Sequence, residues 1–96
     1  MSRPAATSTM QLETTDVRVT RWDFEPGAET GHHRHEFDYV VVPLISGTMT
    51  AETADGDVNG EIVAGVSYNR PAGVEHNVIN SGETAFSFVE IELLKP

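Results

Sequence analysis

Three of the four histidines in this 96-residue chain lie within four consecutive positions, in the stretch GHHRHEFDYVVV, residues 31–42. His33 and His35 are separated by one residue, and residues i and i+2 of a strand point to the same face. Neutral imidazole binds zinc, copper, iron and nickel well. This pair could therefore hold one side of a metal ion if further ligands come from elsewhere in the chain.

Two other residues are candidates for the rest of the ligand set. His76 lies far along the chain, at the head of VEHNV, residues 74–78, which has the composition of a strand. Asp38 follows the histidine pair and could add a carboxylate oxygen, as in the mixed sites of non-haem iron enzymes. The predicted metal ligands are His33, His35, His76 and Asp38. The expected cofactor is a divalent transition metal ion (Fe, Mn, Ni or Zn), and the sequence does not reveal which.

Short strands are the elements expected to position these side chains. No window keeps the apolar spacing of a helix. Apolar and polar residues alternate over residues 17–24 and 85–93, as in strands with one buried face, and residues 39–44 are apolar throughout, as in a strand buried on both faces. Asp55-Gly56 and Asn59-Gly60 are hairpin signals. About seven to nine short strands are expected, which is typical of an all-β sandwich or barrel.

Two glycine-anchored patterns surround the histidines. Residues 65–80 read GVSYNRPAGVEHNVIN and match G-x5-P-x-G-x2-H-x3-N without a gap. The pattern G-x5-H-x-H-x(3,4)-E-x6-G begins at Gly27, continues through His33 and His35 and closes at Gly47. In these two motifs the chain resembles the cupin superfamily, over about residues 27–80. The resemblance implies a small double-stranded β-helix, or jelly-roll barrel, with a metal ion held inside by the motif histidines.

The remaining residues of the second motif have expected roles in the fold. Gly65 and Gly73 can adopt a positive φ in tight turns. Pro71 fixes φ ahead of the second of these turns. Asn80 can hydrogen-bond the backbone where its strand ends.

The chain departs from the first motif at the carboxylate. The motif glutamate falls at Tyr39 or Val40, and Asp38 lies one position early. In one strand register Asp38 faces inward and completes the site. In the other register Tyr39 and Val41 face inward, and the metal has three histidine ligands only, as in some cupins. The sequence leaves both registers open.

One domain is expected, with a flexible tail or an arm at residues 1–10 and a cupin-like barrel at residues 11–96. The net charge of −9 disfavours nucleic acid and anionic membranes as partners. With no cysteine, the chain can form neither disulfides nor thiolate metal sites. No secretory signal or membrane-spanning run is recognisable, so the cytoplasm is the default location. Residues 10–13 and 86–94 are expected to be free strand edges, which predicts a homodimer.

The expected function is that of a metal-dependent enzyme acting on a small molecule, since the resemblance to small cupins implies a dioxygenase, an isomerase or a decarboxylase-like activity. A non-catalytic module that binds or senses a small ligand or metal is the alternative, and an accessory subunit is a third. Only Glu75 and Tyr68 are candidates for proton transfer, and no catalytic residue is assigned. Arg34 and Arg70 are interpreted as surface charges or ion-pair partners.

Overall fold

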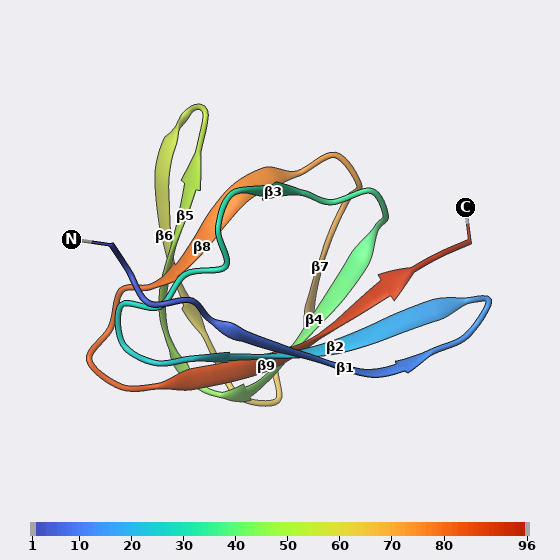
Figure 1. Cartoon of the computed structure of the whole chain (residues 1–96), viewed down its shortest axis with the longest axis horizontal. Coiled ribbons are helices and arrows are strands. Elements are labelled where there is room, and N and C mark those ends of the chain that lie inside the picture. Colours follow the sequence, from blue (N-terminus) through green and yellow to red (C-terminus); the bar gives the residue numbers. More distant parts are fainter. Residues whose placement is uncertain (1, 96) are drawn as a thin grey trace.

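The computed structural model describes residues 2–95. All the regular elements in that range are β-strands. The strands are β1 (Thr7–Glu13), β2 (Val17–Phe24), β3 (His33–Arg34), β4 (Tyr39–Ile45), β5 (Gly47–Thr53), β6 (Gly56–Ile62), β7 (Tyr68–Arg70), β8 (Glu75–Asn80) and β9 (Phe86–Leu93). They form one sheet of order β1-β2-β9-β4-β7 and one of order β3-β8-β5-β6. The pairing within both sheets is antiparallel, and together the sheets make the jelly-roll barrel that the sequence predicts (Figure 1). None of the described residues belongs to a helix long and apolar enough to cross a membrane.

Most expected strands form where the pattern places them, with one exception at a turn signal. The alternating segment 17–24 is β2, and Asp55-Gly56 lies at the hairpin between β5 and β6. The second hairpin signal is wrong, because Asn59 and Gly60 lie inside β6. The first turn already brings residues 56–62 alongside β5, so the antiparallel ladder continues straight through that second dipeptide.

The first and last strands, β1 and β9, both pair with β2 in the larger sheet. β1 begins at Thr7, within the stretch assigned to a tail or arm, and pairs with β2 of the same chain. Ala5 forms a further bridge to Glu29. The expectation that residues 86–94 form a free edge is wrong, because β9 lies between β2 and β4 and is hydrogen-bonded on both sides. The outer strand on this side of the sheet is β1.

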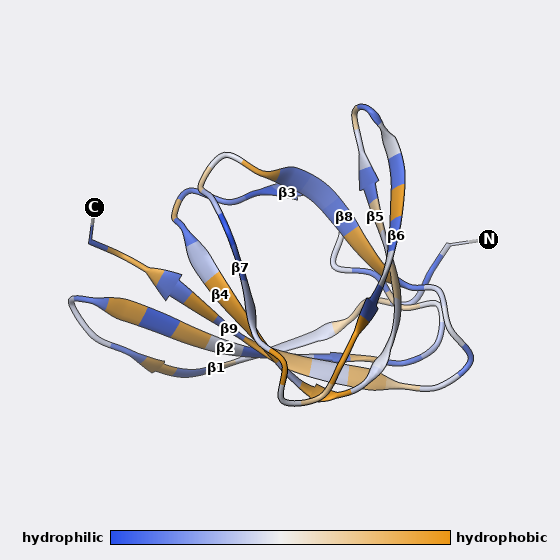
Figure 2. Ribbon diagram, turned by 180° about the vertical axis from the view of Figure 1, so that it is seen from behind, coloured by the Kyte–Doolittle hydropathy of each residue, from blue (hydrophilic) through white to orange (hydrophobic). Residues whose placement is uncertain are grey.

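Aromatic side chains fill the space between the sheets. The Phe24 ring lies with its centroid 4.6 Å from that of Phe86 and 5.5 Å from that of Phe88. Burying side chains of this kind stabilises a fold by roughly 1.5–3 kcal/mol each. Figure 2 shows that β8 is hydrophilic beside β3 and hydrophobic further along. One part of the barrel is therefore packed with apolar groups, while polar side chains gather where β3 meets β8.

The turns around β8 have the conformations expected from the second motif. Gly65 and Gly73 have φ values of 81° and 95°, in the left-handed region that favours glycine. Asn80 accepts a hydrogen bond from the Gly82 amide (3.0 Å) through Oδ1, as expected at a strand exit. Its Nδ2 also donates to the carbonyls of Phe24 (3.2 Å) and Thr84 (2.9 Å), so this buried amide ties the end of β8 to β2.

Candidate metal centre

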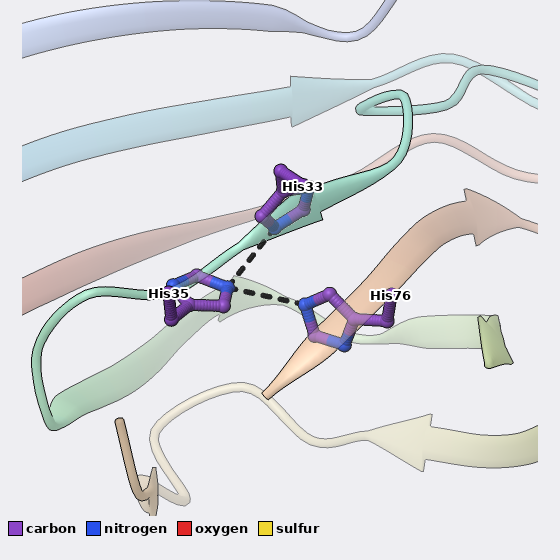
Figure 3. Close-up of side chains that lie close together, drawn as sticks. All are labelled: His33, His35 and His76. Atoms are coloured by element: carbon purple, nitrogen blue, oxygen red, sulfur yellow. Dashed lines mark hydrogen bonds between the residues drawn. The ribbon is translucent and has the colours of Figure 1, made fainter. Parts of the chain in front are cut away.

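The pairing of β3 with β8 brings the motif histidines together. His33 lies directly opposite His76 in the ladder. His35 follows β3 and keeps the pairing going, since its amide donates to the Val74 carbonyl (2.9 Å) and its carbonyl accepts from the Gly73 amide (2.8 Å). His33 and His35 therefore project to the same side, as the i, i+2 spacing predicts. Figure 3 shows the three rings pointing toward one another.

The three imidazoles meet through their Nε2 atoms. The Nε2 atoms of His33 and His35 are 3.0 Å apart, and those of His35 and His76 are 3.1 Å apart. His35 is buried, and the other two rings are half-buried. The group is thus partly shielded from water while one side stays accessible to a small molecule.

Hydrogen-bond partners of His33 and His35 determine which ring nitrogen of each carries the hydrogen. His33 Nδ1 lies 2.8 Å from the Gly31 carbonyl, and His35 Nδ1 lies 3.2 Å from Oε1 of Glu90. Both neighbours can only accept a hydrogen bond, so each Nδ1 carries the hydrogen and each neutral ring has a lone pair on Nε2. Two lone pairs at 3.0 Å repel each other unless a cation lies between them. This donor set therefore fits a metal ion.

His76 offers a third lone pair over most of the pH range. Burial lowers the pKa of His76 to about 4, and the neighbouring His33 and His35 act in the same direction. Desolvation disfavours the charged form of an imidazole. His76 is consequently neutral at physiological pH, which is the form that coordinates metals.

Glu90 is a site residue that the sequence analysis missed. It lies on β9, and its second carboxylate oxygen accepts a hydrogen bond from Trp22 Nε1 (3.0 Å) while the first faces His35 Nδ1. A carboxylate behind a ligating histidine fixes the ring and increases its basicity. A signal was present, because Glu90 alternates with the buried Phe86 and Phe88 and so falls on the inner face of the strand.

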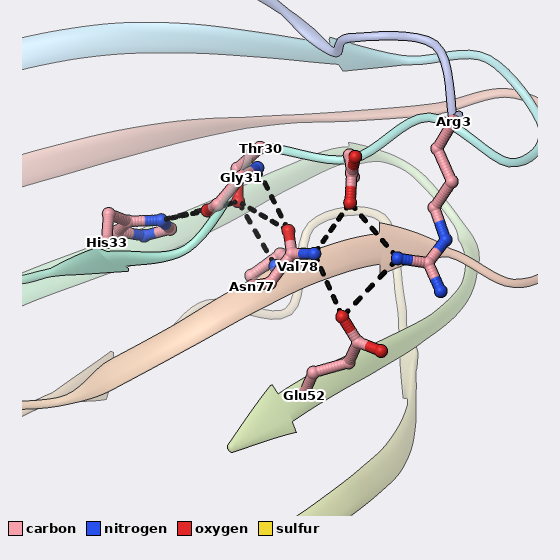
Figure 4. A network of polar contacts seen from close by, with 8 residues as sticks. Arg3, Thr30, Gly31, His33, Glu52, Asn77 and Val78 are labelled. Carbon is pink, nitrogen blue, oxygen red and sulfur yellow. Dashed lines mark hydrogen bonds and ion pairs between the residues drawn. The ribbon is translucent and has the colours of Figure 1, made fainter. Parts of the chain in front are cut away.

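An amide network supports His33 from behind (Figure 4). Asn77 is buried on β8, and its Oδ1 accepts a hydrogen bond from the Gly31 amide (2.9 Å). The same glycine presents its carbonyl to His33 Nδ1. On its other side, Asn77 Nδ2 donates to Glu29 (2.7 Å) and Glu52 (3.0 Å). Asn77 therefore holds the backbone that orients the His33 ring.

Comparison with known proteins supports the resemblance carried by the two glycine-anchored motifs. The family model for the cupin domain matches residues 20–92. This chain belongs to the cupin family. The β-alanine degradation protein BauB of Pseudomonas aeruginosa is 55% identical over 91 residues, which cover 95% of this chain and 96% of that protein.

Solved cupin structures share the fold closely. A cupin domain from Bordetella pertussis Tohama I is 55% identical, with a TM-score of 0.94 and 97% of both chains covered. An uncharacterised protein with a double-stranded β-helix domain from Klebsiella pneumoniae is 26% identical, with a TM-score of 0.77 and coverage of 97% of this chain and 80% of its own. The double-stranded β-helix expected from the sequence is therefore confirmed.

Asp38 lies apart from the three histidines of this cupin. Its side chain is exposed, and Oδ1 accepts a hydrogen bond from the Ala72 amide (2.7 Å). Tyr39 and Val41 face inward instead, each only 3% exposed. The Tyr39 ring stacks on His35 at a centroid distance of 3.9 Å. The structure thus has the register with three histidines and no carboxylate in the group, and Asp38 fastens the turn before β8.

A cavity of about 370 Å³ opens beside the histidines of this cupin. Its wall is largely apolar and includes Trp22, Met49 and Phe88, together with Tyr39 and Tyr68. Burial raises the pKa of both tyrosines, so their hydroxyls stay protonated at neutral pH. The volume falls in the range of pockets that take small organic ligands.

Of the two residues considered for proton transfer, only Tyr68 lines the cavity. Tyr68 lies in its wall, with the hydroxyl 4.0 Å from the Met49 sulfur, whereas Glu75 does not line it. Arg70, interpreted from the sequence as a surface charge or ion-pair partner, also lines the cavity. The residue is exposed, but the register of β7 on β4 sets it opposite the inward-facing Tyr39.

Proposed function

We propose that this cupin binds one divalent transition metal ion through His33, His35 and His76 and acts as a metal-dependent enzyme on a small molecule. The observation that supports this proposal is the close approach of the Nε2 atoms, 3.0 Å between His33 and His35 and 3.1 Å between His35 and His76. Hydrogen bonds at Nδ1 of His33 and His35 leave the lone pair of each ring on Nε2. Imidazole ligands suit Fe, Ni or Zn, and Mn is the further metal expected from the sequence. When bound, such a metal supplies Lewis acidity at positions that the protein leaves open.

The residues of the chain would contribute binding, orientation and exclusion of water. Glu90 and the Gly31 carbonyl hold the His35 and His33 rings in the ligating orientation. The apolar wall limits water around the substrate, which strengthens polar interactions inside the cavity. The protonated Tyr68 hydroxyl can donate a hydrogen bond to a bound molecule. A dioxygenase-like or isomerase-like reaction in the cytoplasm is part of this proposal.

The metabolic setting is proposed from the likeness to BauB. That protein's name assigns it to β-alanine degradation, and the two chains align over nearly their full lengths. We therefore propose that this cupin handles a small metabolite in the breakdown of β-alanine or of a compound like it. The cavity of about 370 Å³ is large enough for such a molecule.

A non-catalytic module that binds or senses a small ligand or a metal is the alternative. The observation in its favour concerns the carboxylates near the histidines. Both oxygens of Glu90 are engaged, by His35 and Trp22, and Glu75 does not line the cavity. A free general base is therefore not evident among the described residues of the site.

Metal analysis of the purified protein tests the proposal. We expect close to one equivalent of metal per chain, and a loss of most of it in His33→Ala and His76→Ala because each removes one of three ligands. His32→Ala is the matched control, since this neighbouring histidine is exposed and outside the group. Unchanged metal content in both ligand variants would contradict the site. Bound Fe or Mn that changes oxidation state during turnover of a small acid would favour the enzyme over the binding module.

A further inference from the structure

Arg70 occupies a place in the cavity wall that the metal site does not explain. On β7 it pairs directly with Tyr39 of β4. Side chains at opposed positions of an antiparallel pair lie on the same face of the sheet. Tyr39 faces inward and stacks on His35. Arg70 is an exposed residue, yet it lies on the same face as Tyr39, and both line the cavity beside the histidines.

The guanidinium of Arg70 is held in place by neutral groups. Its central carbon lies 4.8 Å from the centroid of the Tyr68 ring, a cation–π distance. Its Nη1 donates to the Asn69 carbonyl (3.0 Å). A guanidinium has five N–H donors in a planar fork, so most of them remain available to another partner.

Among residues 2–95, the charge of Arg70 has no carboxylate partner. Within residues 2–95, no carboxylate lies within ion-pair distance of it, whereas Arg3, Arg18, Arg21 and Lys95 all form ion pairs. Two carboxylates line the cavity, but Glu90 is engaged by His35 and Trp22, and both oxygens of Glu61 accept from the Thr48 hydroxyl. The cavity thus presents one positioned cation in a mostly apolar wall.

The single guanidinium favours a carboxylate over a phosphate. The planar fork of arginine matches the two oxygens of a carboxylate. Phosphate sites add backbone N–H groups or further cations, and among the described residues Arg70 is the only arginine or lysine in this wall. The negative charges of Glu61 and Glu90 also disfavour a doubly charged anion. The ligand expected from these features is a small monocarboxylate.

We propose that Arg70 binds the carboxylate of a small organic acid whose other end reaches the Nε2 atoms of His33, His35 and His76. This assigns a substrate class to the cavity and rests on the proposed function for the role of the histidines. Arg70 is then a binding and specificity residue, with Tyr68 as the surface that holds its guanidinium.

Two probes of equal size and different charge test this inference. Binding of propanoate and of propanamide is measured by ligand-detected NMR on the zinc-loaded protein and on the metal-free protein. We expect propanoate to bind more tightly than propanamide in both forms. Arg70→Gln should weaken propanoate binding about ten- to a hundredfold, the loss of a charge-assisted hydrogen bond, and leave propanamide unchanged. Arg34→Gln is the matched control, because Arg34 also lacks an ion pair within residues 2–95 but does not line this cavity.

The outcomes separate this inference from the proposed metal site. Propanoate affinity that is equal in Arg70→Gln and the unchanged chain overturns the role of Arg70, and the metal content of that variant then tests the histidines separately. Propanoate that binds only to the zinc-loaded form, independently of Arg70, means that the metal alone holds the carboxylate and also overturns the inference. Arg70-dependent binding to a protein that takes up no metal supports the inference and contradicts the proposed function.

Discussion

At the scale of single residues, the position of one hydrogen on each imidazole decides what the histidine group can bind. The Gly31 carbonyl and the Glu90 carboxylate accept hydrogen bonds from the Nδ1–H groups of His33 and His35. Their Nε2 lone pairs are then left facing each other. The groups behind the two imidazoles are therefore as important for the proposed metal site as the imidazoles themselves.

Replacing Glu90 by glutamine tests this arrangement. The amide keeps the shape but loses the charge that favours the required His35 tautomer, so we expect zinc affinity to fall about 10- to 100-fold. Competition with a chromophoric chelator measures it, with circular dichroism of the metal-free protein to verify folding. Glu92→Gln is the control, since this carboxylate on the same strand pairs with Arg18 instead. Equal zinc affinity in Glu90→Gln and the unchanged protein would contradict the role of Glu90.

At the scale of elements, close approach between strands explains a glycine that the first motif requires. Gly47 begins β5 where the chain passes over Phe86 of β9. A Cβ atom at this position would lie 2.7 Å from Cδ2 and 2.8 Å from Cβ of the Phe86 side chain. Phe86 is only 1% exposed and packs against Phe24, so it has little room to move. The closing glycine of the motif thus serves the packing of the two sheets.

Gly47→Ala is therefore expected to destabilise the barrel. Overpacking of this kind costs about 1–3 kcal/mol, which would appear as a lower midpoint in urea denaturation. Gly60→Ala on β6 is the matched control, because Gly60 has an ordinary φ and a Cβ there meets nothing within 4 Å. If both variants lost the same stability, strand propensity and not the contact with Phe86 would be the cause.

At the scale of the whole molecule, β1, an outer strand of the larger sheet, is the most exposed element with apolar side chains. Every residue of β1 is exposed, and Met10 and Leu12 are 62% and 48% exposed. The strand carries no lysine or proline, the residues that protect free edges. Arg3, ahead of β1, pairs with Glu29 and Glu52, but ion pairs this exposed contribute little to holding the segment.

This edge predicts a homodimer in which β1 is covered by a second copy. We expect a dimer mass by light scattering at micromolar concentration, and a monomer when Met10→Glu and Leu12→Glu are combined. Val58→Glu is the control, because Val58 is equally exposed, at 61%, but lies on β6 at the edge of the other sheet. A monomer mass for the unchanged chain would contradict the prediction.

Patterns in the sequence were sufficient for most of the strands and for all three histidines of the group. Alternation over residues 17–24 predicted β2 to the residue, because a half-buried strand needs no information from distant parts of the chain. The glycine-anchored motifs placed His33, His35 and His76 together, and the structure does bring them within reach of one another. Positive φ at Gly65 and Gly73 also followed from residue type alone.

Only the tertiary structure decided which other side chains join the histidines. An apolar run has no marked inner face, so residues 39–44 were compatible with either Asp38 or Tyr39 pointing inward, and the pairing of β4 with β7 and β9 selected Tyr39. The same long-range pairing turned Glu90 toward His35 and Arg70 into the cavity. The sequence by itself indicated the fold and the three histidines, because local strand patterns and the two cupin-like motifs mark them, although His76 reaches His33 only through the long-range pairing of β3 with β8. The cavity wall depends on strands far apart in the chain, and only their register decides which charged side chains line it.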